Sequence, residues 1–130
     1  MEIQNLPTSN PINVSIRIVS LQGKKYLLFP DQSKTISVLV KDIVRLEGVR
    51  NYTLLHLKNG TIMLSSRTLK VYENVLSEVG FLRVHRAHLI NLYYMKHYDE
   101  LDLTFAVMQN KDQISISRRK RKDFQDRIAL

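Results

Sequence analysis

The chain has 130 residues, the length of one domain, and its 44% hydrophobic and 25% charged residues are typical of a globular protein. It contains no cysteine, which excludes disulfides, thiolate zinc sites and cysteine nucleophiles. The 20 Lys and Arg residues against 12 Asp and Glu residues give a formal net charge of +8, which attracts polyanions. Nucleic acid is therefore the leading class of partner.

The first residues predict a loose arm. Pro7 and Pro11 stand among Asn, Thr and Ser, so residues 1–11 are interpreted as a flexible N-terminal arm and residues 12–130 as the folded domain. No basic segment followed by a long apolar run is present, and no apolar stretch approaches the roughly 20 residues of a membrane span. We expect a cytoplasmic protein without membrane insertion.

The next part of the chain predicts short antiparallel strands. Val14, Ile16 and Ile18 alternate with polar residues, and a turn is expected at Gln22 and Gly23. Asn59 and Gly60 predict a hairpin between two neighbouring strands. Further runs with β character cover residues 25–29, 36–39, 43–47, 52–57, 61–64, 81–84 and 89–94.

Two segments predict helices. Leu69, Tyr72, Leu76 and Val79 recur every three or four residues, from a Ser66 cap to Gly80. After a hairpin expected from residues 101–108 and 113–117, Phe124 and Ile128 share one face of a short C-terminal helix. The expected fold class is mainly β, with small antiparallel sheets, one internal helix and a short C-terminal helix.

Five basic residues follow one another from Arg118 to Lys122, where the last strand meets the terminal helix. Arg can make paired hydrogen bonds to guanine, whereas Lys acts mainly as a point charge toward phosphate. Two other interpretations stay open: a solvated charged turn, or a basic helix lying on an anionic membrane with Phe124, Ile128 and Leu130 as anchors.

The chain offers no recognisable metal or catalytic constellation. His85 and His88 are three residues apart, a spacing that points side chains to opposite faces of a strand, so a metal site is not expected. The acidic residues Asp99, Glu100 and Asp102 are interpreted as a turn. No nucleophile stands beside a base, and the glycines form no phosphate-binding loop, so we predict neither a cofactor nor an enzyme.

The segment FLRVHRAHLINLYYM, followed by a hairpin and then ISISRRKRKDF, resembles the C-terminal half of the LytTR DNA-binding family. Upstream, DIVRLEGVRNYTLLHLKNG and SSRTLKVYENVLSEVGF resemble that family's strand, Asn-Tyr turn, hairpin and helix. The likeness spans roughly residues 25–128. It departs from the family pattern at Ala87, His88, Ile90 and Met95. We interpret Asn91 as structural, its amide joining the strand end to a neighbouring backbone group.

The resemblance implies a LytTR-like domain that approaches DNA with loops and strand ends rather than with a recognition helix. It implies a regulator of transcription that reads major-groove bases, with two copies on repeated half-sites, and with a possible homodimer on DNA and a possible regulatory partner protein. By their chemistry, Asn51, Arg86 and Arg119 are expected to read bases, and Arg118, Lys120 and Lys122 to position phosphates. The implied DNA-contact residues are Arg50, Asn51, Tyr52, His85, Arg86, Arg118 and Arg119.

Two further interpretations of the basic patch stay open. The patch could bind a carboxylate-rich protein, which would make the chain a protein-interaction module. An RNA-binding role would require exposed aromatic rings for base stacking, and Tyr52, Tyr93 and Tyr94 are the candidates.

Overall fold

The computed structural model describes residues 15–129. Their first sheet contains β1 (Arg17–Leu21), β2 (Lys24–Asp31) and β3 (Lys34–Leu39), in that order and antiparallel. Gln22 and Gly23 form the expected turn, with φ angles of 53° and 80° that suit the right-handed twist of a hairpin. Ile16 is buried, as its alternation indicates. The predicted arm and Val14 lie outside the described residues.

The central sheet has five strands in the order β6-β5-β4-β8-β7. All neighbouring pairs are antiparallel. Asn59 and Gly60 form the hairpin turn that the sequence predicts, and the Asn59 side chain accepts a hydrogen bond from the Thr61 N–H at 2.9 Å. The strands are β4 (Ile43–Val49), β5 (Tyr52–Leu57), β6 (Ile62–Ser65), β7 (Phe81–His85) and β8 (His88–Asn91).

The third sheet has the order β11-β10-β9, formed by β9 (Met95–Tyr98), β10 (Phe105–Met108) and β11 (Gln113–Ser115). The predicted strand over residues 89–94 ends at Asn91, because a 3₁₀ turn, η5 (Leu92–Tyr94), interrupts it, and β9 follows as a separate strand. The strand predicted to begin at residue 101 begins only at Phe105. The acidic segment before it is a turn, as predicted, and the Asp99 carboxylate accepts N–H bonds from three following residues.

Two α-helices complete the described part of the chain, α1 (Leu69–Leu76) and α2 (Arg121–Ile128). The predicted Ser66 cap is wrong: the residue before α1 is Thr68, which makes no side-chain cap. Gly80 ends the helical segment in the left-handed conformation, with φ of 98°, as predicted. The remaining 3₁₀ turns are η3 (Val40–Asp42), η4 (Ser77–Val79) and η6 (Arg118–Lys120). No helix within residues 15–129 has the length and apolar composition needed to cross a membrane.

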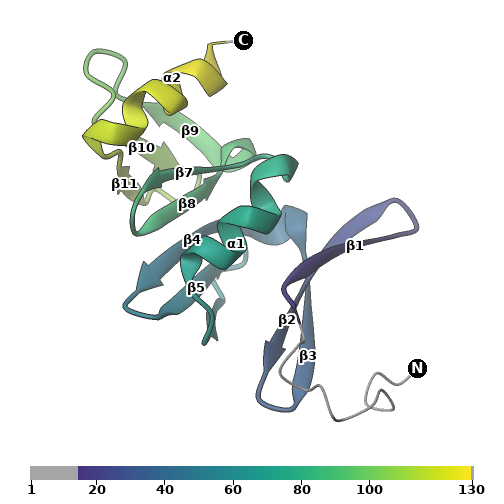
Figure 1. Cartoon of the computed structure of the whole chain (residues 1–130). Helices are drawn as coiled ribbons and strands as arrows, with labels where there is room; N and C mark the ends of the chain where they lie inside the picture. The colour runs from purple at the N-terminus through teal and green to yellow at the C-terminus, as the bar shows by residue number, and fades with distance from the viewer. Residues whose placement is uncertain (1–14, 130) are drawn as a thin grey trace.

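Two hydrophobic cores lie on the two faces of the central sheet. Neighbouring side chains of a strand point to opposite faces, and Leu89 belongs to one core while Ile90 belongs to the other. The first core contains α1 and the β1–β3 sheet, with the Phe29 and Tyr72 rings 6.2 Å apart edge to face. The second contains the β9–β11 sheet and α2, through Phe124. Figure 1 shows α1 in front of the central sheet and α2 beyond its upper edge. The fold is the mainly antiparallel β architecture that the sequence predicts.

Candidate DNA interface

The turn between β4 and β5 carries the first group of residues that the family resemblance assigns to DNA contact. Val49 pairs with Tyr52, so Arg50 and Asn51 form a two-residue turn, and Arg50, Asn51 and Tyr52 are all exposed. Arg50 has φ of 59°, in the left-handed region that costs a non-glycine residue about 1–2 kcal/mol. The chain therefore places an exposed cation where glycine would relieve backbone strain.

The second group lies at the turn between β7 and β8. His85 pairs with His88, which leaves Arg86 and Ala87 as the turn, and the Arg86 side chain is exposed. The Nδ1 atom of His85 accepts a hydrogen bond from the Ala87 N–H at 3.0 Å. This bond requires Nδ1 to be unprotonated, so the neutral ring carries its hydrogen on Nε2. His85 thus both shapes the turn and keeps a donor for a second partner.

Arg83 fixes the backbone of this turn. Its Nε donates to the carbonyl oxygen of His85 at 2.9 Å and its Nη2 donates to the carbonyl oxygen of Arg86 at 2.5 Å. Its Nη1 donates to the carboxylate of Glu73 on α1 at 2.7 Å. One guanidinium therefore joins the helix to two consecutive carbonyls of the turn, which uses the fork of donors that only arginine has. The family resemblance assigned Arg83 no role, so it is a positioning residue that sequence reasoning missed.

A backbone contact brings the two turns together. The Gly48 N–H, near the end of β4, donates to the Ala87 carbonyl oxygen at 2.9 Å. A Cβ atom at Gly48 would lie 3.3 Å from the Cβ of Leu69, the first residue of α1, so a larger residue there would require Leu69 to shift by a few tenths of an ångström. The close approach of helix, strand and turn sets where Arg50 and Arg86 lie relative to each other.

The third group follows β11, as the sequence predicts. The Ser117 N–H donates to the Val84 carbonyl oxygen at 2.8 Å, which attaches this segment to β7 just before its turn. The η6 turn then presents Arg118 and Arg119, which are exposed, and Lys120, which is half-buried. Lys122 lies further along, on α2, and its Nζ is 3.5 Å from the Asp126 carboxylate.

A shallow hollow of about 350 Å³ joins the second and third groups. It is lined by Lys70, Glu73, Arg83, Arg86, Ser117, Arg119 and Lys120. Its carboxylate, Glu73, is already paired with Arg83 at 2.7 Å and lies 3.8 Å from Lys70. Arg86, Arg119 and Lys120 make no ion pair with any carboxylate of residues 15–129. The hollow is therefore an electropositive surface whose cations are available for an anion.

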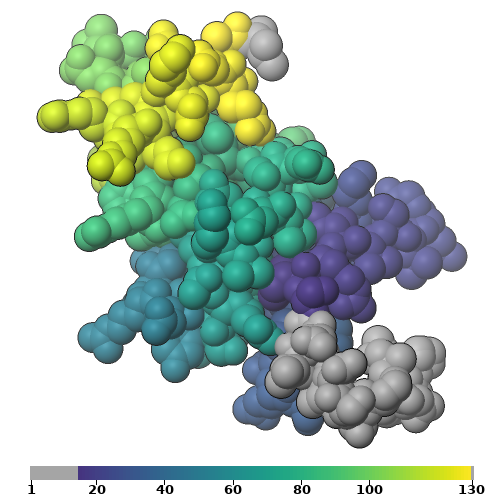
Figure 2. Space-filling model, viewed as in Figure 1, coloured from purple at the N-terminus to yellow at the C-terminus, as the bar shows by residue number. Residues whose placement is uncertain are grey.

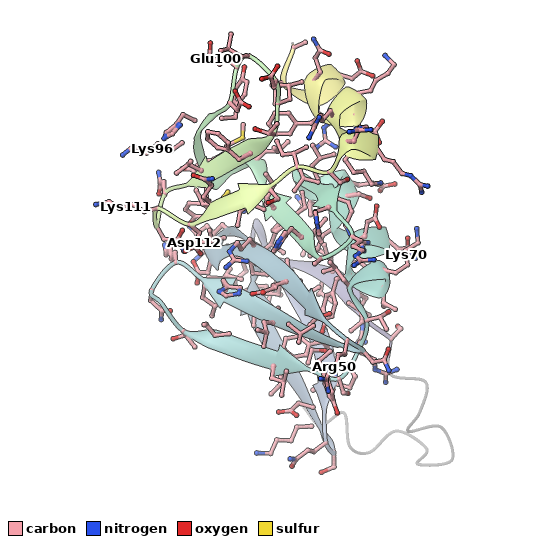
Figure 3. All side chains as sticks on the ribbon, turned by 90° about the vertical axis from the view of Figure 1, so that its left-hand side faces the viewer. Arg50, Lys70, Lys96, Glu100, Lys111 and Asp112 are labelled. Carbon is pink, nitrogen blue, oxygen red and sulfur yellow. The ribbon has the colours of Figure 1, made fainter. Side chains whose placement is uncertain are left out.

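Figure 3 shows where this face lies on the molecule. Lys70 stands on the right-hand side of that view and Arg50 lies lower down, whereas Lys96 and Lys111 project on the left. The predicted DNA-contact residues of the three groups come from segments more than 30 residues apart in the chain, and backbone hydrogen bonds bring these segments together. The candidate face is therefore assembled from three parts of the chain, of which the charged run at residues 118–122 is one.

The expectation that His85 and His88 point to opposite faces is wrong. The segment is a hairpin, and the register of β7 against β8 shifts between Arg83 and His85, so the two rings lie on one face with centroids 5.1 Å apart. Burial, and then the nearby His85 and Arg45, lower the pKa of His88 to about 4. His88 is therefore neutral near pH 7. Among residues 15–129, no three potential metal ligands gather at one place.

A separate ion-pair network surrounds a buried arginine of the central sheet. Arg45, on β4, is 9% exposed, and its Nε donates to the carboxylate of Asp112 in the β10–β11 turn at 3.0 Å. Its Nη1 is 3.6 Å from Glu47, which also accepts from His56 at 3.0 Å. This network joins the central sheet to the third sheet.

Three comparisons with known proteins concern the family and the fold of this chain. Residues 33–129 match the LytTr DNA-binding domain family. Over 86 residues the chain is 34% identical to the heme-containing CO-sensing transcriptional regulator RcoM 2 of Paraburkholderia xenovorans (strain LB400), which is 65% of this chain and 32% of that protein. The fold is similar to the LytTr DNA-binding domain of a protein described as a methyl-accepting/DNA response regulator from Bacillus cereus, with a TM-score of 0.68 and 17% identity over 81% of this chain and 97% of that one.

The fold and the family match define the class of this chain as a DNA-binding domain. The chain belongs to the LytTR DNA-binding domain family. The family is one of DNA-binding domains rather than of enzymes. The chain spans about a third of the length of the curated relative that it matches.

Proposed function

We propose that this protein is a transcription regulator that recognises a specific DNA sequence through the turns and strand ends of one face. The observation that carries the proposal is the convergence of the Arg50–Tyr52 turn, the Arg86 turn and the Arg118–Lys120 segment, which backbone hydrogen bonds from Gly48 and Ser117 support. Cations from separate parts of the chain, fixed on a rigid frame, suit a ligand with regularly spaced negative charges.

The side chains of this face divide by chemistry into two groups. Arg86 and Arg119 are exposed and offer forked donors that match the O6 and N7 atoms of guanine, and Asn51 matches adenine. Arg118, Lys120 and Lys122 lie further along η6 and α2, where they suit phosphate oxygens. Arg50, Tyr52 and His85 lie on the two reading turns and complete the proposed contact set.

We further propose that two copies bind repeated half-sites, because a domain of this size covers about one major groove and its neighbour. A homodimer on DNA follows from that arrangement. The relative RcoM 2 is named a transcriptional regulator, which supports the regulatory role; its heme and CO sensing are statements about that protein alone. Such a regulator acts in the cytoplasm, where a partner protein that covers the basic face could control it.

The test is selection of bound duplexes from a random pool, followed by titration of the selected duplex and a scrambled duplex at two salt concentrations. We expect one enriched motif with repeated half-sites, bound about 10³-fold more tightly than the scrambled duplex at the same salt. Equal, steeply salt-dependent binding to every duplex would contradict the proposal, since the +8 charge alone would then explain the affinity. A carboxylate-rich protein partner would become the leading alternative in that case.

A further inference from the structure

A second, larger hollow lies at the other end of the central sheet. Its volume is about 670 Å³, within the range of roughly 300–1,000 Å³ typical of small-molecule sites. Asn91, the last residue of β8, lines it and donates from its side-chain amide to the carbonyl oxygen of Ile43, the first residue of β4, at 2.9 Å. The DNA-reading turns lie beyond the opposite ends of these two strands. The two hollows are therefore separate sites.

Lysines surround this hollow. Lys24 and Lys25 come from the start of β2, Lys41 from η3 and Lys58 from the end of β5, whereas the lining contains one carboxylate, Glu78. Four positive charges and one negative charge give a net charge of +3. Lys58 is paired with Asp42 at 3.4 Å, but the other three lysines form no ion pair with a carboxylate of the described chain. Like charges that lie close together repel one another, and a bound anion would relieve that repulsion.

A fixed, exposed aromatic ring stands among these lysines. Tyr93 is 79% exposed, and its ring packs edge to face on Tyr94 with centroids 5.1 Å apart. Tyr94 is itself anchored, because its hydroxyl donates to the Lys41 carbonyl oxygen at 2.5 Å. The Tyr93 N–H donates to the Asn91 side chain at 3.1 Å. An exposed ring on a fixed backbone offers a flat surface on which a planar ring can stack.

The wall on the β1–β2 side comes from residues that precede the family match. Figures 1 and 2 show the β1–β2 hairpin projecting from the body on the right, and the tip of this hairpin supplies Gly23, Lys24 and Lys25. The family match begins at residue 33, after both strands. Half of the lysines of the hollow therefore belong to a part of the chain that lies outside the matched DNA-binding domain.

We propose that this hollow binds a small phosphorylated molecule with a planar ring, of the nucleoside diphosphate or triphosphate class. Lys24, Lys25 and Lys41 supply point charges for the terminal phosphates, the mode of phosphate binding to which lysine is suited. Tyr93 supplies the stacking surface, and the apolar side chains of Val40 and Val79 lie in the same lining. The DNA-binding hollow, by contrast, uses arginines and has no aromatic side chain in its lining.

The test is titration of the 130-residue protein with ADP, pyrophosphate and adenosine in turn. Binding is monitored through the NMR chemical shifts of the backbone amides. We expect the largest shifts within residues 23–25, 39–41 and 91–94, with ADP binding more tightly than pyrophosphate. The double variant Lys24→Gln, Lys41→Gln should lower the affinity for ADP at least about tenfold. Tyr93→Ser should lower the affinity for ADP to that for pyrophosphate, because the stacking surface is lost. Absence of shifts at about 10 mM ADP would overturn the proposal.

The matched control is Lys96→Gln with Lys111→Gln, which removes the same charge from two exposed lysines away from the hollow (Figure 3). If this control weakens ADP as much as the Lys24 and Lys41 pair does, general electrostatics explain the binding and the site is refuted. The same variants are titrated with a random duplex, because DNA also offers phosphates. If the Lys24→Gln, Lys41→Gln variant loses affinity for ADP and for the duplex equally, while the control variant loses neither, the hollow is part of the DNA-binding surface. That result would contradict the proposal.

Discussion

Arg83 donates from its Nη2 to the carbonyl oxygen of Arg86 at 2.5 Å, so one arginine of β7 holds in place the turn that presents another. We predict that Arg83→Lys weakens binding to the selected duplex about five- to tenfold, because a single ammonium cannot reach both turn carbonyls and Glu73 together. The net charge does not change, so the slope of affinity against salt should stay the same. Fluorescence anisotropy at several salt concentrations measures both quantities.

Stability provides the control for this prediction. Loss of hydrogen bonds between charged groups costs about 1.5–3 kcal/mol each at most, so urea denaturation should show Arg83→Lys still folded at the temperature of the binding assay. Glu73→Gln removes the charge on α1 and leaves the bonds from Arg83 to the turn, and its effect on DNA affinity should be smaller. An Arg83→Lys protein that binds the duplex like the parent would show that the turn needs no clamp.

Base reading and phosphate positioning predict different patterns of loss. Arg119→Ala should cost about 1–3 kcal/mol on the selected duplex and leave binding to scrambled DNA nearly unchanged. Lys122→Ala should weaken binding to both duplexes by the same factor. It should also lower the slope of log affinity against log salt concentration by about one, because the Lys122 side chain is 83% exposed and suited to phosphate. Titration of each variant with both duplexes distinguishes a base-reading residue from a phosphate-positioning one. If the two variants lose affinity in the same pattern, the division into readers and positioners is wrong.

Arg50 has a strained backbone conformation and also belongs to the proposed DNA-contact set. Arg50→Gly should relieve about 1–2 kcal/mol of left-handed strain at φ of 59°, offset by about 0.4–1 kcal/mol from the greater freedom of glycine in the unfolded chain. We therefore expect equal or slightly higher stability together with weaker DNA binding. Asn51→Ala, at a position without positive φ, should weaken DNA binding with no gain in stability. Thermal unfolding and anisotropy separate these outcomes, and unchanged duplex affinity in Arg50→Gly would remove Arg50 from the contact set.

The parts of the fold that the sequence predicts are those with local causes. The Asn59 and Gly60 turn, the left-handed Gly80 and the shared face of Phe124 and Ile128 each depend on neighbours within a few residues. The role of Asn91 is also confirmed, since its amide joins β8 to the Ile43 carbonyl. The short β9 strand was missed because its preceding 3₁₀ turn is made of the same aromatic and aliphatic residue types as a strand.

The candidate site is harder to predict, because its geometry depends on register and on distant partners. The shift in register between Arg83 and His85 brings His85 and His88 onto one face, and residue spacing alone does not reveal such a shift. Arg83 donates mainly to backbone carbonyls, which leave no trace in the side-chain pattern. The lysine hollow gathers residues from five separate segments, and each lysine by itself is an ordinary exposed residue.

His88 should make the stability of the fold depend on pH. Burial, followed by the charges of His85 and Arg45, lowers its pKa from 6.5 to about 4, so between these values the unfolded chain binds a proton that the folded chain does not. Stability should therefore fall as the pH drops from 6.5 toward 4, and this contribution should be level outside that window. Its size should be about 1–2 kcal/mol, because solvent around this half-buried ring weakens the effect. The lowered pKa of His56, also caused mainly by burial, acts in the same direction.

His88→Phe tests this contribution, because phenylalanine fills a similar space, cannot titrate, and removes the buried His88 Nδ1, which has no hydrogen-bond partner among the described residues. Urea denaturation of both proteins at several pH values between 5 and 7.5 gives the comparison. The carboxylates contribute equally to both proteins, so the difference between the two stability curves isolates His88. We expect the parent to lose stability faster than His88→Phe as the pH falls, with the residual slope in the variant due to the carboxylates and His56. Parallel curves would show that His88 binds its proton equally well in the folded and unfolded chains.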